Sequence, residues 1–305
     1  MTHILPKIWF NKTVVDSNQA SLHVASSAVL YWLSVYTVFP ILKNGDSFFA
    51  FRIQEHLERL QNSAKLIGME LPYECSSLDI FTQAIQTLVQ ANQPQQTVFA
   101  RATIHVDELI PGTRTKWLHT TLSVFLYEAK SIIPQEGARL KTSIWRRNPD
   151  FCIPSRAKVN GAYVNSVLAK QDAIDSGYDD AFFLDLNGHV CELSAANIFL
   201  VRNNTLVTPT ISNDILEGIN RKTILEVAHV EDIRVEERTV DLTELYIADE
   251  IFACGTSAFF ASIIEIDGRS IGMGKEWPIT KRLKERMQKI QSWNDVLSHL
   301  YLTKI

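Results

Sequence analysis

Residues 145–165 read WRRNPDFCIPSRAKVNGAYVN, and this stretch decides the fold class. Lys158 lies between an extended segment marked by Pro154 and a predicted helix that starts at Ala162, and Tyr163 follows five residues after the lysine. Side chains at such junctions are held by rigid backbone, and catalytic and binding sites are commonly formed there. A lone lysine is far more often a solvated surface charge. The functional interpretation is a Schiff-base lysine with a phenol close by.

The segments after this junction predict short strand pairs mixed with helices. Asn187-Gly188 and the residues after Val201 are turn signals between alternating apolar runs, which is typical of hairpins. The predicted strands are 181–186, 189–193, 197–201, 205–207, 251–254 and 260–266, and the predicted helices are 162–176, 221–230 and 279–292.

The segments before the junction predict a second strand-and-helix unit. Strands are expected at 7–15 (turned at Asn11-Lys12), 47–52, 97–105 and 120–127, and helices at 54–67 and 78–91. Residues 131–139 (SIIPQEGAR) contain Pro134 and Gly137 and have no periodicity, as in a linker. We therefore predict an α/β protein with an N-terminal domain (1–130), a linker (131–138) and a C-terminal domain (139–305) that carries Lys158.

Composition excludes several classes of protein. The 305 residues are 46% hydrophobic and 21% charged, with a formal net charge of -4, which favours a packed protein and gives no basic excess for nucleic acid. No apolar run reaches the ~20 residues of a membrane helix, and the N-terminus lacks a signal-peptide layout. The 4 cysteines form no CxxC pair, so we expect neither a metal site nor a disulfide scaffold, and a cytoplasmic location.

Three further features suggest a cofactor site. Glu192 is predicted in a strand among small and polar neighbours, and a buried carboxylate there needs a cationic partner such as a protonated pyridine. Leu216–Arg221 leads into a helix whose first N–H groups can bind an anion. Cys254–Ser257 offers a glycine and two hydroxyls after a strand, although an ordinary turn would look the same. A pyridoxal phosphate enzyme requires a lysine, a phenol, a glutamate and phosphate-binding segments, and the sequence offers all of these.

At this point the sequence resembles a known family. The blocks FRIQEHLERLQNSAKLIG (51–68), WRRNPDFCIPSRAKVNGAYVN, GHVCELSAANIFLV, TLVTP, LEGINRKTI and ADEIFACGTSAFF are similar, in order and spacing, to the fold-type IV (class IV) pyridoxal-phosphate aminotransferases, especially those for branched-chain amino acids. The resemblance implies a two-domain fold with pyridoxal 5'-phosphate between the domains, and a homodimer whose partner subunit helps to close the site.

The resemblance also implies roles for individual residues. Lys158 is expected to hold the cofactor and move protons, Tyr163 to bind its 3'-oxygen, and Glu192 to bind its ring nitrogen. Arg52 is expected to bind the phosphate group of the cofactor. The remaining cofactor contacts are expected at Leu216, Ile219, Asn220, Gly255 and Thr256, and the substrate contacts at Tyr31, Tyr36, Phe99, Arg101, Thr256 and Ser257. Arg101 falls near the arginine that binds the distal carboxylate of glutamate or 2-oxoglutarate, in a looser alignment, and a surface position is its alternative.

Three positions depart from the family pattern. Asn220 stands where threonine is usual, and Trp32 and Val38 stand where relatives have glycine, which leads us to expect an altered backbone and a narrower substrate pocket. The alternative for Trp32 is core packing. The implied activity is a transaminase for branched-chain or other hydrophobic amino acids with 2-oxoglutarate. Three alternatives stay open: a D-amino acid or amine transaminase, an aminodeoxychorismate lyase, and a cofactor-binding protein without activity.

Overall fold

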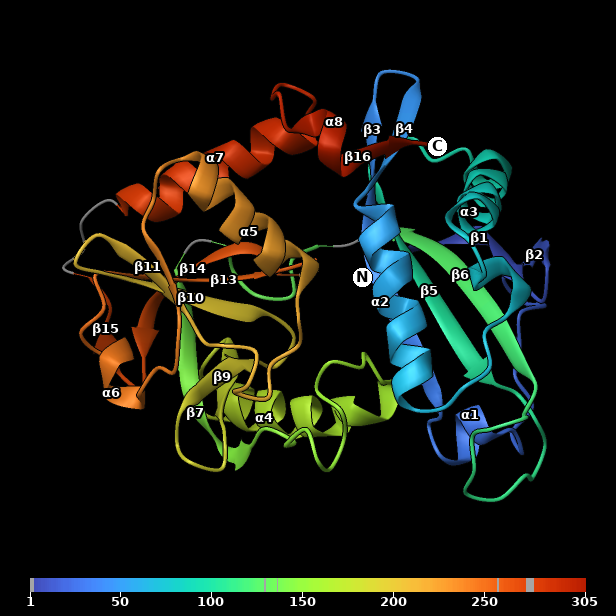
Figure 1. Ribbon diagram of the computed structural model, residues 1–305, viewed down its shortest axis with the longest axis horizontal. Coiled ribbons are helices and arrows are strands. Elements are labelled where there is room, and N and C mark those ends of the chain that lie inside the picture. Colours follow the sequence, from blue (N-terminus) through green and yellow to red (C-terminus); the bar gives the residue numbers. More distant parts are fainter. Residues whose placement is uncertain (1–2, 129, 136, 257, 273–276) are drawn as a thin grey trace. The chain divides into compact units, whose positions relative to one another are not determined.

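The computed structural model describes residues 3–305 except 129, 136, 257 and 273–276, and the side chain of Phe259 is also left aside. The chain divides into two compact units, which are drawn together in Figure 1. Unit 1 comprises residues 1–130, 157–161 and 290–305, and unit 2 comprises 131–156 and 162–289. Each unit is described by itself below.

The sheet of unit 1 is antiparallel throughout its described pairs, in the order β16-β4-β3-β5-β6-β1-β2. The β1–β2 hairpin turns at Asn11 and Lys12, which both have positive φ (49° and 68°), as a type I′ turn requires. The strands are β1 (His3–Phe10), β2 (Thr13–Asp16), β3 (Ser34–Asn44), β4 (Ser47–Phe51), β5 (Val98–Val106), β6 (Thr120–Glu128) and β16 (Leu302–Lys304).

Two long helices pack on this sheet. In α2 (Ile53–Leu66), Leu57, Leu60 and Ala64 recur at three- and four-residue steps, and all three are buried. In α3 (Leu78–Asn92), the Ser77 hydroxyl accepts a hydrogen bond from the Ile80 N–H and caps the first turn. The shorter helices of this unit are α1 (Ser27–Leu30), η1 (Tyr73–Cys75) and α8 (Ser298–Tyr301).

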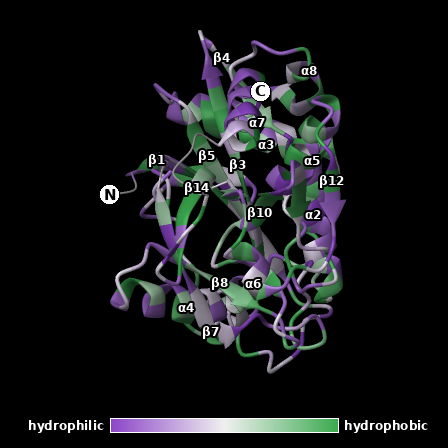
Figure 2. Ribbon diagram, turned by 90° about the vertical axis from the view of Figure 1, so that its left-hand side faces the viewer, coloured by the Kyte–Doolittle hydropathy of each residue, from purple (hydrophilic) through white to green (hydrophobic). Residues whose placement is uncertain are grey.

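Unit 2 contains a mixed sheet in the order β12-β11-β10-β13-β14-β7-β8-β9, with β15 paired to β14. β7 runs parallel to both β14 and β8. Figure 2 colours much of β14 as hydrophobic, in keeping with its fully buried Ala261, Ile263 and Ile266. The strands are β7 (Ala138–Arg146), β8 (Asp180–Leu184), β9 (Val190–Leu193), β10 (Asn197–Arg202), β11 (Thr205–Thr208), β12 (Val235–Glu237), β13 (Glu250–Gly255), β14 (Phe259–Ile266) and β15 (Arg269–Ser270).

Helices flank the sheet of unit 2. α4 (Tyr163–Asp175) contacts β7 and β8, and α5 (Ile219–Val230) contacts β13 and β12. Two more helices are α6 (Leu242–Leu245) and α7 (Pro278–Gln291), and a 3-10 turn, η2 (Asn160–Ala162), crosses the division between the units. None of the described helices is long and apolar enough to cross a membrane.

The α/β prediction is confirmed, but the predicted domains differ from the two units. Residues 131–138 were expected to form a linker, whereas Ile133 lies in the core of unit 2. Residues 157–161 and 290–305 were placed in the C-terminal domain, whereas both belong to unit 1. The physical reasons are long-range pairings: Val159 bridges to Val35, and β16 pairs with β4.

Candidate functional site

The backbone of Lys158 is fixed to the sheet of unit 1. Its N–H donates to Ser63 Oγ (3.0 Å), and its carbonyl accepts from the Tyr36 N–H (3.0 Å). Ser63 belongs to α2 and Tyr36 to β3, so a helix and a strand together hold the lysine. Its Nζ lies 4.9 Å from the centroid of the Tyr36 ring. An amine at the end of a fixed backbone is suited to covalent attachment and proton transfer.

Tyr36 also contacts Arg101, which lies on the neighbouring strand β5. The guanidinium carbon of Arg101 is 3.7 Å from the Tyr36 ring centroid, so one buried phenol ring contacts both cations. Phe99, two residues earlier on β5, packs against Tyr127 of β6 with 5.8 Å between ring centroids. The structure thus brings Tyr36, Arg101 and Lys158 together in unit 1. Phe99 lies two residues from Arg101 on β5, and Tyr31, at the end of α1, is 47% exposed.

Arg52 and Arg59 both lie near a buried histidine of α2. The Arg52 guanidinium pairs with Glu55 (2.6 Å) and lies over the Tyr301 ring (4.5 Å). The Arg59 guanidinium donates to Thr37 Oγ1 (3.3 Å), which is also 2.7 Å from His56 Nδ1. Burial, and then the charges of Arg59, Lys158 and Arg52, lower the pKa of His56 well below its ordinary value. Sequence reasoning missed Arg59, although the EHLERL block contains it.

Glu192 is buried in β9 of unit 2 and has a cationic partner from the chain itself. Its Oε1 lies 2.8 Å from the Arg147 guanidinium, and its Oε2 accepts from Asn197 Nδ2 (3.0 Å) and from the Leu216 N–H (3.2 Å). The sequence analysis predicted that a buried Glu192 needs a cationic partner, and the only partner it suggested was a protonated pyridine nitrogen. Arg147 was missed because it lies 45 positions earlier, and only the fold brings it close.

Asn197 links Glu192 to the start of α5. Its Nδ2 also donates to the Leu216 carbonyl (3.0 Å), and its Oδ1 would lie 2.0 Å from any Cβ placed on Gly218. Gly218 is the N-cap of α5 and supplies no capping side chain, so the helix dipole and first N–H groups at Ile219 and Asn220 can face an anion.

The second predicted anion-binding segment, which begins at Cys254, lies at the end of β13. A Cβ on Gly255 would come within 3.2 Å of the Ala195 carbonyl, so this position favours glycine for close packing. Thr256 follows and is half-buried, whereas Ser257 lies outside the described residues. Because Cys254 of β13 pairs with Asn197 of β10, the end of β13 and the residues around Glu192 belong to one region of unit 2. Tyr163 is the first residue of α4, also in unit 2.

The two departures from glycine have different backbones. Trp32 has φ of 52°, so its backbone has the left-handed conformation that favours glycine. Its side chain is 53% exposed, which excludes core packing. Val38 is buried within β3, opposite Arg101.

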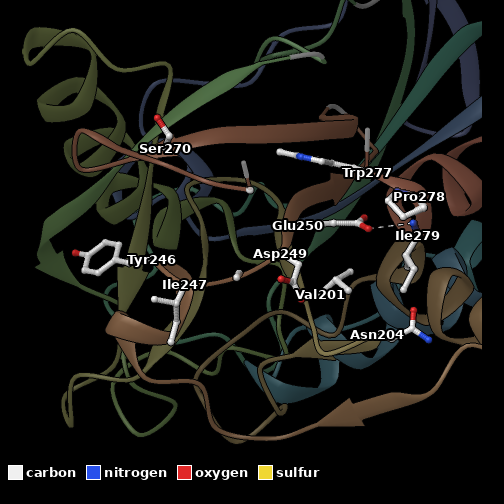
Figure 3. A pocket seen from close by; sticks show the side chains of 12 residues that line it. Val201, Asn204, Tyr246, Ile247, Asp249, Glu250, Ser270, Trp277, Pro278 and Ile279 are labelled. Atoms are coloured by element: carbon white, nitrogen blue, oxygen red, sulfur yellow. Dashed lines mark hydrogen bonds between the residues drawn. The ribbon is translucent and has the colours of Figure 1, made fainter. Parts of the chain in front are cut away.

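A cavity of about 570 Å³ in unit 2 lies apart from these residues. Figure 3 shows its lining, including Asp249, Glu250 and Trp277. Glu250 accepts hydrogen bonds from the N–H groups of Ile279 and Thr280 at the start of α7. Because Glu250 begins β13 and Gly255 ends it, this cavity and the anion-binding segment that begins at Cys254 lie at opposite ends of the strand.

Comparisons with known proteins agree with this arrangement. The family model "Amino-transferase class IV" matches residues 34–266. A "probable branched-chain-amino-acid aminotransferase" of Aquifex aeolicus is 34% identical over 297 residues, covering 93% of this chain and 94% of its own length.

Two solved structures align over almost the whole chain. A branched-chain aminotransferase of Thermoproteus uzoniensis with norvaline has a TM-score of 0.93 and 32% identity, covering 99% of each chain. A branched-chain amino acid aminotransferase of "T.th." complexed with N-(5'-phosphopyridoxyl)-L-glutamate has a TM-score of 0.89 and 31% identity, covering 98% of each chain. The chain therefore belongs to the class IV aminotransferases, which are enzymes that use pyridoxal 5'-phosphate.

Proposed function

We propose that this enzyme transfers the amino group of branched-chain or other hydrophobic amino acids to 2-oxoglutarate. The observation that carries the proposal is the contact of Lys158 and Arg101 with the same Tyr36 ring, because it puts a reactive amine and a carboxylate-binding cation in one part of unit 1. The relatives' names, and the norvaline and phosphopyridoxyl-glutamate complexes of two of them, support both substrates.

Lys158 is the proposed covalent anchor and proton carrier. When bound, pyridoxal phosphate supplies an electron sink for the substrate α-carbon. The hydrogen bonds of the Lys158 backbone to Ser63 and Tyr36 fix its Cα, so its Nζ searches a small volume once the substrate amine has displaced it. In that position the released amine would carry a proton between the substrate α-carbon and C4′ of the bound cofactor.

The cofactor-binding residues of unit 2 fit a pyridinium ring and a phosphate. Glu192, held by Arg147 and Asn197, presents a fixed carboxylate to a protonated ring nitrogen. The α5 N-terminus at Ile219 and Asn220 has no side-chain cap and offers backbone donors to phosphate. We assign the remaining cofactor contacts to Tyr163, Leu216, Gly255 and Thr256, as the resemblance implies.

We propose Arg59 for the phosphate contact that sequence reasoning gave to Arg52. Arg52 lies just before α2, where it pairs with Glu55 at 2.6 Å and lies over Tyr301. Arg59 donates to Thr37 Oγ1 and lies one helical turn before Ser63, which binds the Lys158 backbone. A guanidinium on that face of α2 is better placed to bind an anion near Lys158.

Substrate discrimination is assigned to unit 1. Arg101 receives the distal carboxylate of glutamate and 2-oxoglutarate, whereas aromatic side chains contact the hydrophobic substrates. These aromatic residues are Tyr31, Tyr36 and Phe99. The substrate α-carboxylate is assigned to Thr256 and Ser257, as the resemblance implies.

A homodimer in the cytoplasm completes the proposal. Exposed apolar side chains on α4, namely Val164, Val167 and Leu168, support self-association. The four unpaired cysteines suit a reducing compartment. Sedimentation of the active enzyme at the monomer mass would contradict the dimer, and fractionation of the source cell tests the location.

Two measurements test the function. Borohydride reduction and peptide mapping should place the cofactor on Lys158, and a label on another lysine would contradict the assignment. Half-reactions with L- and D-amino acids and amines, followed by cofactor absorbance, should be fastest with L-leucine, L-isoleucine, L-valine and L-glutamate. A preference for D-amino acids, amines or aminodeoxychorismate would identify one of the alternative activities, and no reaction with any donor would indicate loss of activity.

A further inference from the structure

The Arg101 guanidinium is a fixed cation without a carboxylate partner among the described residues. It lies 3.7 Å from the Tyr36 ring centroid, and its Nη2 donates to Asn160 Oδ1 (2.7 Å). Both partners are uncharged, so they orient the guanidinium and leave its positive charge available. A planar cation held in this way is suited to a carboxylate.

Asn160 is itself held in one orientation. Its Nδ2 donates to the Ser34 hydroxyl (2.8 Å), and Ser34 is buried at the start of β3. The amide can satisfy both neighbours only with its oxygen toward Arg101 and its nitrogen toward Ser34. Rotation of the amide by 180° would place an NH₂ group against the guanidinium.

The backbone of Asn160 is tied to the same strand as Lys158. Val159 forms a bridge with Val35, and the Tyr36 N–H donates to the Lys158 carbonyl. The segment 158–160 therefore carries the reactive lysine at one end and the partner of Arg101 at the other.

We propose that Asn160 is a positioning residue that determines specificity for dicarboxylate substrates by orienting Arg101. The inference rests on the proposed function, in which Arg101 binds the distal carboxylate of glutamate and 2-oxoglutarate. Orientation in advance lowers the entropic cost of binding a second carboxylate. A monocarboxylate such as leucine has no group for Arg101 and is insensitive to Asn160.

The test compares two unreactive ligands on the holoenzyme by titration calorimetry. Glutarate carries a distal carboxylate, and 4-methylpentanoate has a branched apolar end instead. In Asn160→Ala, the Kd of glutarate should rise about tenfold, the effect of one lost hydrogen bond to a charged group, whereas that of 4-methylpentanoate should change less than about twofold. Asn160→Asp should weaken glutarate more than Asn160→Ala does, because its carboxylate competes for Arg101.

Kinetic constants give a second readout. The KM for glutamate should rise in both variants, with little change in the rate and apparent affinity of the half-reaction with leucine, which needs no dicarboxylate. Ser34→Ala removes only the hydroxyl that accepts from the Asn160 amide and should shift the ratio of the two ligand affinities in the same direction by a smaller factor. This variant keeps the inference testable if Asn160→Ala does not fold.

Asn92→Ala is the matched control. Asn92 is also a half-buried asparagine of unit 1, and its amide bonds the Lys7 N–H and carbonyl. It should lower stability and leave the ratio of the two ligand affinities unchanged. In an Arg101→Met background, Asn160→Ala should have no further effect on glutarate, since its target is gone.

The outcomes separate this inference from the proposed function. Equal weakening of both ligands in Asn160→Ala, or a wild-type enzyme that does not bind glutarate, overturns the inference and leaves transamination of hydrophobic amino acids intact. A wild-type enzyme that transaminates no amino acid overturns the proposed function, whereas the ratio of ligand affinities still decides the role of Asn160.

Discussion

The ion pair between Glu192 and Arg147 joins a buried carboxylate to a mostly buried guanidinium, with side-chain exposed fractions of 8% and 13%. Replacing one member of such a pair leaves the other as an uncompensated buried charge, which typically costs about 3–5 kcal/mol. The same carboxylate is proposed to keep the cofactor ring cationic. One residue therefore affects both stability and chemistry, and the two effects can be measured separately.

We expect Glu192→Gln to slow α-proton removal by orders of magnitude and to lower the free energy of unfolding by several kcal/mol. Stopped-flow absorbance measures the first and urea denaturation the second. The double variant Glu192→Gln/Arg147→Met should recover much of the stability but none of the rate. Unchanged single-turnover rates in Glu192→Gln would assign the carboxylate a structural role only.

Trp32 carries a local backbone cost. An L-residue in the left-handed region is disfavoured by roughly 1–2 kcal/mol, and glycine is not. Because Trp32 is 53% exposed, Trp32→Gly should change the free energy of unfolding by no more than about 1 kcal/mol, instead of the roughly 3–5 kcal/mol lost when a core tryptophan is truncated. Urea denaturation tests this expectation.

The same variant tests the narrowing of the substrate pocket. If Trp32 restricts substrate scope, Trp32→Gly should gain activity on donors bulkier than leucine. An unchanged ranking of amino donors would remove the pocket role and leave Trp32 as a surface residue.

Helix α2 shows how an element sets the charge state of its own side chain. His56 is buried, and the charges of Arg59 in the same helix, of Lys158 and of Arg52 just before the helix act on it, so its neutral form is favoured in the folded state. Its pKa is lower folded than unfolded. Between the two pKa values the unfolded chain binds more protons, and stability must fall as pH decreases below about 6.5.

We expect the urea midpoint of the ligand-free protein to fall between pH 7 and pH 5 more steeply in the wild type than in His56→Gln. Glutamine can also form a hydrogen bond with the Thr37 hydroxyl but does not titrate. The other titrating groups are common to both proteins, so the difference isolates His56. Parallel curves would mean that His56 titrates as in the unfolded chain.

At the scale of the whole molecule, the C-terminus returns to the N-terminal sheet. β16, the last strand, pairs antiparallel with β4, and the preceding Tyr301 lies over Arg52 and against Phe51. Deleting residues 302–305 would expose the edge of β4 and remove a buried Leu302.

We expect this truncated chain to unfold at a lower temperature and to aggregate more readily, as measured by calorimetry and light scattering. Leu302→Ala, which keeps the strand pairing, should show an intermediate loss. A truncated chain with wild-type stability would show that β16 contributes little to unit 1.

The sequence by itself determined the elements with strong local patterns. The apolar periodicity of α2 and α3, the Asn-Gly hairpin of β8 and β9 and the Asn-Lys hairpin of β1 and β2 were all predicted within a few residues, because their signals lie within one helix or one turn. The family blocks, similarly, led to the class IV aminotransferases and pyridoxal phosphate, since their order and spacing are visible along the chain.

Only the tertiary structure decided the features that join distant positions. Three such features are the place of Lys158 and the C-terminal residues in unit 1, the pairing of Arg147 with Glu192, and the hydrogen bond between Arg101 and Asn160. They depend on strand pairing or on contacts between residues that lie 45 to more than 100 positions apart in the sequence. Short strands such as β16 were missed for the same reason: three residues carry no periodicity, and their extended conformation is stabilised by hydrogen bonds to a strand far away in sequence.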